Sequence, residues 1–271
     1  MKRANLYIGA VLVGIVILLG IISFFWMPFD PTQVSTDRLQ LPTAQHLFGT
    51  DDFGRDIFSR ILSGAGICLL VGIVSVGIGA IIGVPMGMIA AVKGGLFERF
   101  VMRVADIMYA FPAILLAILL AAARGSGSTW TAMVAIGVAS IPAFARVSRA
   151  STLQVLNQDY MVASRACGTP RYVSIFTHVL PNVAPTIMVQ GSVSFALAIL
   201  AEAALSYLGL GASPDHPTWG LMLFDAQKSI LVEPNLALWP AMFIAITVLG
   251  FNLLGDGLRE ILDPRLREQG Q

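Results

Sequence analysis

The side chains that could do chemistry are few, and their spacing favours ion pairing over catalysis. Asp51 lies four residues before Arg55, and Asp56 lies four residues before Arg60. At this spacing, opposite charges meet on one face of a helix. Apolar residues recur at the same interval on another face: Phe53, Ile57 and Ile61. We therefore predict a self-paired helix over residues 51–60 that braces the element after it, with direct substrate contact as the less favoured alternative.

The sequence lacks the common signatures of an enzyme. It contains no Gly-x-x-x-x-Gly-Lys-Ser/Thr phosphate loop, so this chain cannot itself be an ATPase. His-Glu-x-x-His is also absent, and the three histidines are too dispersed to supply a nucleophile and its base. His46, His216 and Met222 could be imagined as a nickel-receiving set, but they lack a recognised ligand spacing. We predict no catalytic residue, no metal site and no cofactor bound by this chain.

The composition is that of a membrane protein. The chain has 271 residues, of which 56% are hydrophobic and 12% charged, whereas a soluble domain carries about 25% charged residues. A net charge of +1 argues against a nucleic-acid partner. The apolar runs are continuous, which favours helices surrounded by lipid over a barrel. We predict an all-α polytopic protein with six transmembrane helices, near residues 6–27, 64–92, 105–123, 128–147, 187–208 and 236–254.

The basic residues set the orientation of these spans. Most of the seventeen lysines and arginines fall on one side if the N-terminus is cytoplasmic, as the positive-inside rule requires. Both termini are then cytoplasmic. The long connections are residues 28–63 and 209–235 outside, and 148–186 inside.

Small residues and prolines predict how the spans pack and bend. Gly79, Gly83 and Gly87 recur every four residues, so a second helix can approach that face closely. Three prolines inside predicted spans should kink or interrupt them: Pro85, Pro112 and Pro142.

Three acidic residues fall near span ends. Glu202 lies near the outer end of the fifth span, where a charge is costly unless it faces a partner or water. Structural and pathway roles are both open for it. We expect Asp106 and Asp256 to pair with nearby Arg103 and Arg259 or to reach the interface.

The inside connection predicts two short helices meeting at a glycine corner. Gly168 can end the first helix in a left-handed conformation, Thr169 can cap the second, and Pro170 suits its first position. Small residues keep the first helix slim enough to enter a groove on a cytoplasmic protein: Ala163, Ser164 and Ala166. From the residues alone, an ordinary helical connector is the commoner alternative.

This inside segment resembles the permease loop of binding-protein-dependent ABC importers, whose short helix couples to the ATPase. The matching positions are Ala163, Ser164, Gly168, Ile175, Leu180 and Pro181, and Arg165 and Ala166 lie within the same stretch. The sequence departs from the family pattern at Val162, where an acidic residue is common, and at Ser164, where alanine is common.

Three further stretches resemble peptide and nickel importer permeases of the dipeptide "C" subunit type. Residues 49–60 match the segment before the second helix, including Asp51, Gly54, Arg55 and Asp56. Residues 205–211 with 217–220 match an outer loop, and residues 251–259 with 262–265 match a C-terminal signature.

The resemblance implies a type I ABC importer permease fold in the bacterial inner membrane. Residues 1–63 would form an anchor and extracytoplasmic segment, and residues 64–271 the core permease domain. The implied partners are a homologous permease forming a heterodimer, two cytoplasmic ABC ATPases holding ATP and Mg, an extracytoplasmic solute-binding protein and membrane lipid.

The cargo that the resemblance favours is a dipeptide or oligopeptide, with nickel chelates, glutathione and other small solutes as alternatives. A rival from another class is an ATP-independent secondary transporter or channel. Such a protein would place ionisable residues near mid-membrane, whereas the charges here cluster at span ends.

Overall fold

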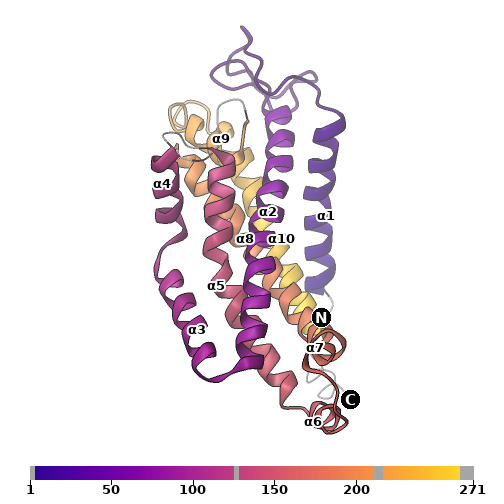
Figure 1. Ribbon diagram of the computed structural model, residues 1–271. Coiled ribbons are helices and arrows are strands. Elements are labelled where there is room, and N and C mark those ends of the chain that lie inside the picture. Colours follow the sequence, from indigo (N-terminus) through magenta and orange to yellow (C-terminus); the bar gives the residue numbers. More distant parts are fainter. Residues whose placement is uncertain (1–3, 125–127, 210, 212–215, 263–271) are drawn as a thin grey trace.

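The chain folds into a bundle of helices (Figure 1). A computed structural model describes residues 4–124, 128–209, 211 and 216–262. The long helices are α1 (Ala4–Phe25), α2 (Ile57–Lys93), α3 (Gly95–Ala110), α4 (Ala113–Arg124), α5 (Thr129–Leu156), α8 (Leu180–Tyr207) and α10 (Asn235–Leu262). Short helices are α6 (Asp159–Ala166), α7 (Arg171–Ser174), the π-helix η1 (Ile175–Val179) and α9 (Trp219–Ala226). The predicted all-α polytopic class is confirmed.

Five single helices in the described chain are long and apolar enough to cross a membrane, and the count is six if the bent pair α3 and α4 forms one span. The interruption predicted at Pro112 is confirmed, and it divides the predicted span over residues 105–123 into two helices. The chain bends by 82° between α3 and α4, and Phe111 there has extended backbone angles. Pro112 explains the break, because proline disfavours helical geometry in the residue before it and has no N–H to donate.

The predicted helix over residues 51–60 is also wrong. The Asp51 carboxylate accepts hydrogen bonds from the backbone N–H groups of Phe53 and Arg55, which favours a turn over a helix. Asp56 instead caps α2, accepting from the Ser59 N–H at 2.7 Å. The second span therefore begins at Ile57, before its predicted start at Gly64.

The glycine strip on α2 brings it close to α5, as predicted. A Cβ added at Gly83 would overlap the Ile141 carbonyl oxygen, and one added at Gly87 would overlap that of Ala145. The contact between α2 and α5 is the most extensive in the bundle.

The first and last spans pack together at one end of the bundle. A Cβ added at Gly257, late in α10, would collide with Leu6, early in α1. The beginning of α1 and the end of α10 therefore lie side by side, at the same end as α3, α6 and α7 (Figure 1). Residues 26–56 and α9 lie at the opposite end.

Candidate functional site

A glycine corner joins α6 and α7, and we call residues 159–174 the knuckle. Gly168 has φ of +76°, a left-handed conformation that costs other L-residues about 1–2 kcal/mol. The Thr169 N–H donates to the Ser164 carbonyl at 3.2 Å and so closes the end of α6. The predicted pair of short helices is confirmed, with α7 beginning one residue after Pro170.

One side of the knuckle is anchored in the core. Met161 of α6 is 1% exposed and belongs to a cluster with Val84 of α2, Val155 of α5 and Val179 of η1. The Ser164 and Ser174 hydroxyls lie 3.5 Å apart across the corner. Packed side chains therefore connect α6 to α2, α5 and α8.

The other side of the knuckle is open. Ala163, Ala166 and Gly168 are exposed, and a Cβ added at Gly168 would meet no atom of the described chain within 4 Å. The corner therefore exposes backbone and small side chains beside the exposed Tyr160 and Val162, at the end of the bundle where α1 begins (Figure 1).

The remaining predicted loop residues lie beyond the knuckle. Ile175 opens the π-helix, while Leu180 and Pro181 begin α8. The connection is shorter than the predicted 148–186, because α5 continues to Leu156 and α8 starts at Leu180. Of Arg165, the structure describes only the backbone, within α6.

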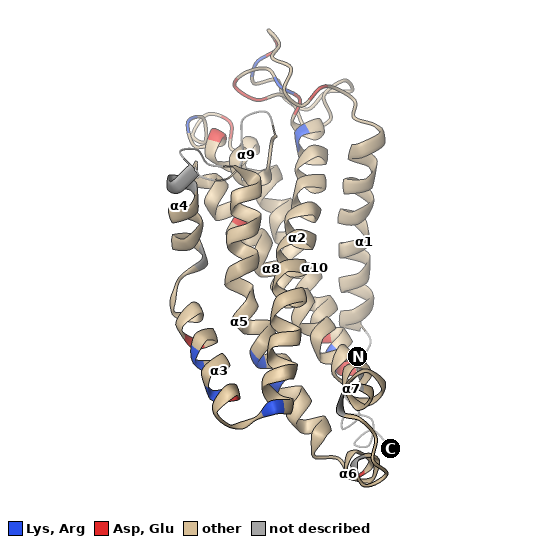
Figure 2. Ribbon diagram, in the orientation of Figure 1, with Lys and Arg blue, Asp and Glu red and all other residues tan. Residues whose placement is uncertain are grey.

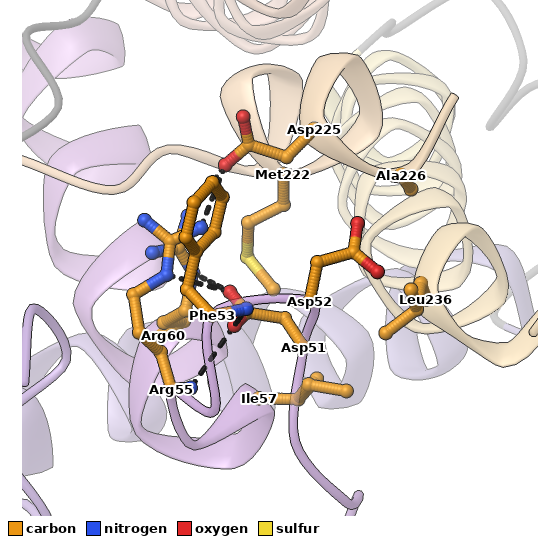
Figure 3. Close-up of a pocket in the computed structure, with 10 residues that line it drawn as sticks. All are labelled: Asp51, Asp52, Phe53, Arg55, Ile57, Arg60, Met222, Asp225, Ala226 and Leu236. Carbon is orange, nitrogen blue, oxygen red and sulfur yellow. Dashed lines mark hydrogen bonds and ion pairs between the residues drawn. The ribbon is translucent and has the colours of Figure 1, made fainter. Parts of the chain in front are cut away.

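At the opposite end, four charged residues form the outer ion-pair cluster: Asp51, Arg55, Arg60 and Asp225 (Figure 3). Arg55 Nη2 lies 2.9 Å from Asp225 Oδ2, and Arg60 Nη2 lies 3.3 Å from the same oxygen. Arg55 Nε also lies 2.7 Å from Asp51 Oδ2, as the spacing predicted, although within a turn. Arg60 is 1% exposed.

This cluster differs from the predicted one. Asp56 does not pair with Arg60; its carboxylate caps α2 and lies 2.8 Å from His46 Nδ1. Arg60 instead pairs with Asp225 of α9, a partner that no short sequence spacing could have identified. Gly54, with φ of +75°, allows the turn that carries Asp51 and Arg55. The cluster joins the outer segment to α9 by ion pairs between residues far apart in sequence.

Glu202 is enclosed between α8 and α9. It is 5% exposed, and the Ser206 hydroxyl donates to its Oε1 at 2.6 Å. Helix α9 packs closely against α2 and α8 beside this residue. The Trp219 Nε1–H donates to the Ile61 carbonyl at 3.0 Å, and a Cβ added at Gly220 would overlap Ala203. Within this subunit, the carboxylate therefore faces protein.

The structure does not bring His46, His216 and Met222 together as a nickel-binding group. His46 lies against Asp56, Met222 is buried beside the outer ion-pair cluster, and His216 is exposed. Among the residues that the structure describes, no group of three histidine, cysteine, aspartate or glutamate side chains is placed to hold a metal ion.

Two ion pairs join α3 and α5 that the sequence analysis does not predict. Asp106 Oδ1 lies 2.9 Å from Arg146 Nη2, not against the expected Arg103. Glu98 pairs with Arg149 in the same way. Both pairs lie toward the end of the bundle that carries the knuckle.

Comparison with known proteins identifies the family. The family described as "Binding-protein-dependent transport system inner membrane component" matches residues 83–268. The glutathione transport system permease protein GsiD of Pectobacterium atrosepticum is 43% identical over 264 residues, covering 95% of this chain and 87% of that protein. GsiD of Salmonella typhimurium is 43% identical over 266 residues, covering 96% and 88%.

A solved structure shares the fold. The MetNI methionine ABC transporter in an inward-facing conformation superposes with a TM-score of 0.61 at 20% identity, covering 74% of this chain and 94% of that one. This confirms the predicted type I ABC importer permease fold. Of the resembling stretches, Leu210 and residues 263–265 lie outside the described residues. The chain belongs to the binding-protein-dependent transport system inner membrane component family, as a multi-pass ABC importer permease of the peptide/nickel group.

Proposed function

We propose that this chain forms half of the pathway of an ATP-driven importer, with a homologous permease as the other half. Two ABC ATPases on the cytoplasmic side hold ATP and Mg, and an extracytoplasmic solute-binding protein delivers the cargo. The chain contributes no catalytic residue; its work is to bind these partners and change conformation.

The knuckle is the observation that carries this proposal. It is exposed at its glycine corner, and the cluster that contains Met161 packs it against three spans. It lies at the end of the bundle where lysines and arginines gather on α2, α3 and α5 (Figure 2). The positive-inside rule supports a cytoplasmic position for this end, and in this proposal the knuckle lies beside the ATPases.

The mechanism follows from this anchoring. Closure of the ATPases on ATP pushes on α6, and the packed cluster around Met161 passes the displacement to α2, α5 and α8. Because these helices interlock through residues such as Gly83 and Gly87, they move as a unit. The pathway then opens outward to receive cargo.

Short peptides are the cargo that we propose, with glutathione as the first to test. Glutathione is itself a tripeptide, and the GsiD relatives align over most of both chains. Dipeptides and longer oligopeptides share its backbone amides and terminal charges. Nickel chelates are the alternative within the same family.

Uptake into cells lacking the chromosomal copy tests this cargo. Labelled glutathione, a labelled dipeptide and a nickel chelate are each supplied to cells with and without the restored chain. We expect chain-dependent uptake of a peptide that stops on ATP depletion. Chain-dependent uptake that survives ATP depletion would instead assign a secondary transporter.

A further inference from the structure

A basic and apolar surface on α3 is not covered by any other part of the chain that the structure describes. Lys93, Arg99 and Arg103 are exposed, and Arg99 and Arg103 form no ion pair with any described residue. Arg99 Nε–H reaches only the Gly95 carbonyl of its own helix, at 3.4 Å, and the Lys93 ammonium lies 4.5 Å from the Phe97 ring centroid.

The acidic residues of α3 do not neutralise these charges. Glu98 and Asp106 are taken by Arg149 and Arg146 of α5. The acids therefore face the bundle while the bases face away from it. Figure 2 shows this gathering of blue residues at the lower end of α2 and along α3.

Large apolar side chains share the exposed face with the two arginines. Leu96 is 78% exposed and Phe100 is 68% exposed. With Arg103 and Ile107 they follow spacings of four, three and four residues, so all lie on one side of the helix. The opposite side buries Val101 and Ala105. Adjacent apolar and basic stripes are typical of helices at a membrane surface.

The length of α2 allows this surface to lie outside the hydrocarbon. Its 37 residues span about 55 Å, whereas the hydrocarbon core is about 30 Å thick. Because charges are costly within the hydrocarbon, Lys93, Arg99 and Arg103 favour a position of this end of α2 and of α3 at the headgroup layer.

We propose that the α3 surface formed by Arg99 and Arg103, with Leu96 and Phe100 beside them, binds the headgroup phosphate of an anionic phospholipid. The guanidinium groups, one helical turn apart, contact phosphate oxygens while the apolar side chains lie against the acyl chains. Guanidinium matches phosphate in geometry as well as charge. The neighbouring Lys93 adds to the attraction.

Native mass spectrometry of the full chain in detergent micelles tests this site, with phosphatidylglycerol or phosphatidylcholine as the added lipid. We expect preferential binding of phosphatidylglycerol. Each basic residue contributes about fivefold in affinity, so Arg99→Gln with Arg103→Gln should weaken phosphatidylglycerol binding by about thirtyfold. Phosphatidylcholine binding should not change.

Two matched variants separate this site from general effects. Arg38→Gln with Lys228→Gln removes the same charge from exposed positions at the other end and should leave lipid binding unchanged. Arg99→Lys with Arg103→Lys keeps the charge and should retain most of the preference.

Equal phosphatidylglycerol binding by the Gln variant and the unaltered chain would overturn the proposal. So would loss of binding in the Lys variant to the level of the Gln variant. If the Gln variant kept its lipid but no longer co-purified with an ATPase subunit, the surface would be a protein contact instead. None of these outcomes depends on which cargo is carried.

Discussion

Replacing Gly168 by valine isolates the conformational requirement of the knuckle. Gly168 has φ of +76°, and an L-residue there costs about 1–2 kcal/mol, with β-branched residues at the upper end. An added Cβ meets no described atom within 4 Å, so we expect no clash to add to this conformational cost. The penalty corresponds to about a 5- to 30-fold loss in the population of the native corner.

The assay is reconstitution of the permease pair with its ATPase subunits. We expect Gly168→Val to weaken ATPase association by that factor and to lower uptake in proportion, with the thermal stability of the bundle unchanged. Gly168→Asn is the matched control, because asparagine tolerates the left-handed conformation, and it should stay near the unaltered chain. If the valine variant assembles and transports normally, the knuckle is not the coupling element.

Substitutions at three further sites, with matched controls, test the packing and the polar groups. Gly87→Ala should destabilise the bundle by about 1–3 kcal/mol through overlap with Ala145, whereas Gly77→Ala, which meets open space, should not; equal melting temperatures would contradict the predicted α2–α5 contact. Asp225→Asn should lower stability by about 1.5–3 kcal/mol and speed proteolysis of residues 28–56, because Arg55 and Arg60 lose a shared partner. Asp52→Asn, which affects only the Ser229 hydrogen bond, should cost less, and an equal cost would refute this account of the outer ion-pair cluster. Glu202→Gln should keep both uptake and the Ser206 hydrogen bond, whereas Glu202→Leu should lower the stability by about 1–3 kcal/mol because leucine cannot accept the hydrogen bond from the Ser206 hydroxyl; lost uptake at normal stability in the glutamine variant would assign Glu202 to the pathway.

Local signals predicted the parts of the fold that depend on local physics. The glycine strip at Gly79, Gly83 and Gly87 faces α5 because only a smooth face permits that approach. The corner at Gly168 also formed as expected, because left-handed backbone geometry strongly favours glycine.

Spacing failed where two local preferences competed. Asp51 and Arg55 have the interval of a helical pair, but the Asp51 carboxylate binds backbone N–H groups and holds a turn instead. By contrast, the break within the apolar run over residues 105–123 is the interruption that Pro112 predicts.

Pairing across the fold could not be predicted from one sequence. Asp225 joins Arg55 and Arg60, and Arg146 reaches Asp106, over separations far longer than any helical repeat. The packing of the helices determines which charged residues meet. Arg99 and Arg103 are left without ion pairs among the described residues because α5 pairs with the neighbouring acids of α3.

Uptake into proteoliposomes tests the central claim most directly. The chain, its partner permease, the ATPase subunits and the solute-binding protein are reconstituted, and labelled glutathione uptake is measured with ATP on the ATPase side. The account predicts uptake that requires ATP, the binding protein and an intact Gly168 corner. Equal uptake without ATP or without the ATPase subunits would contradict it.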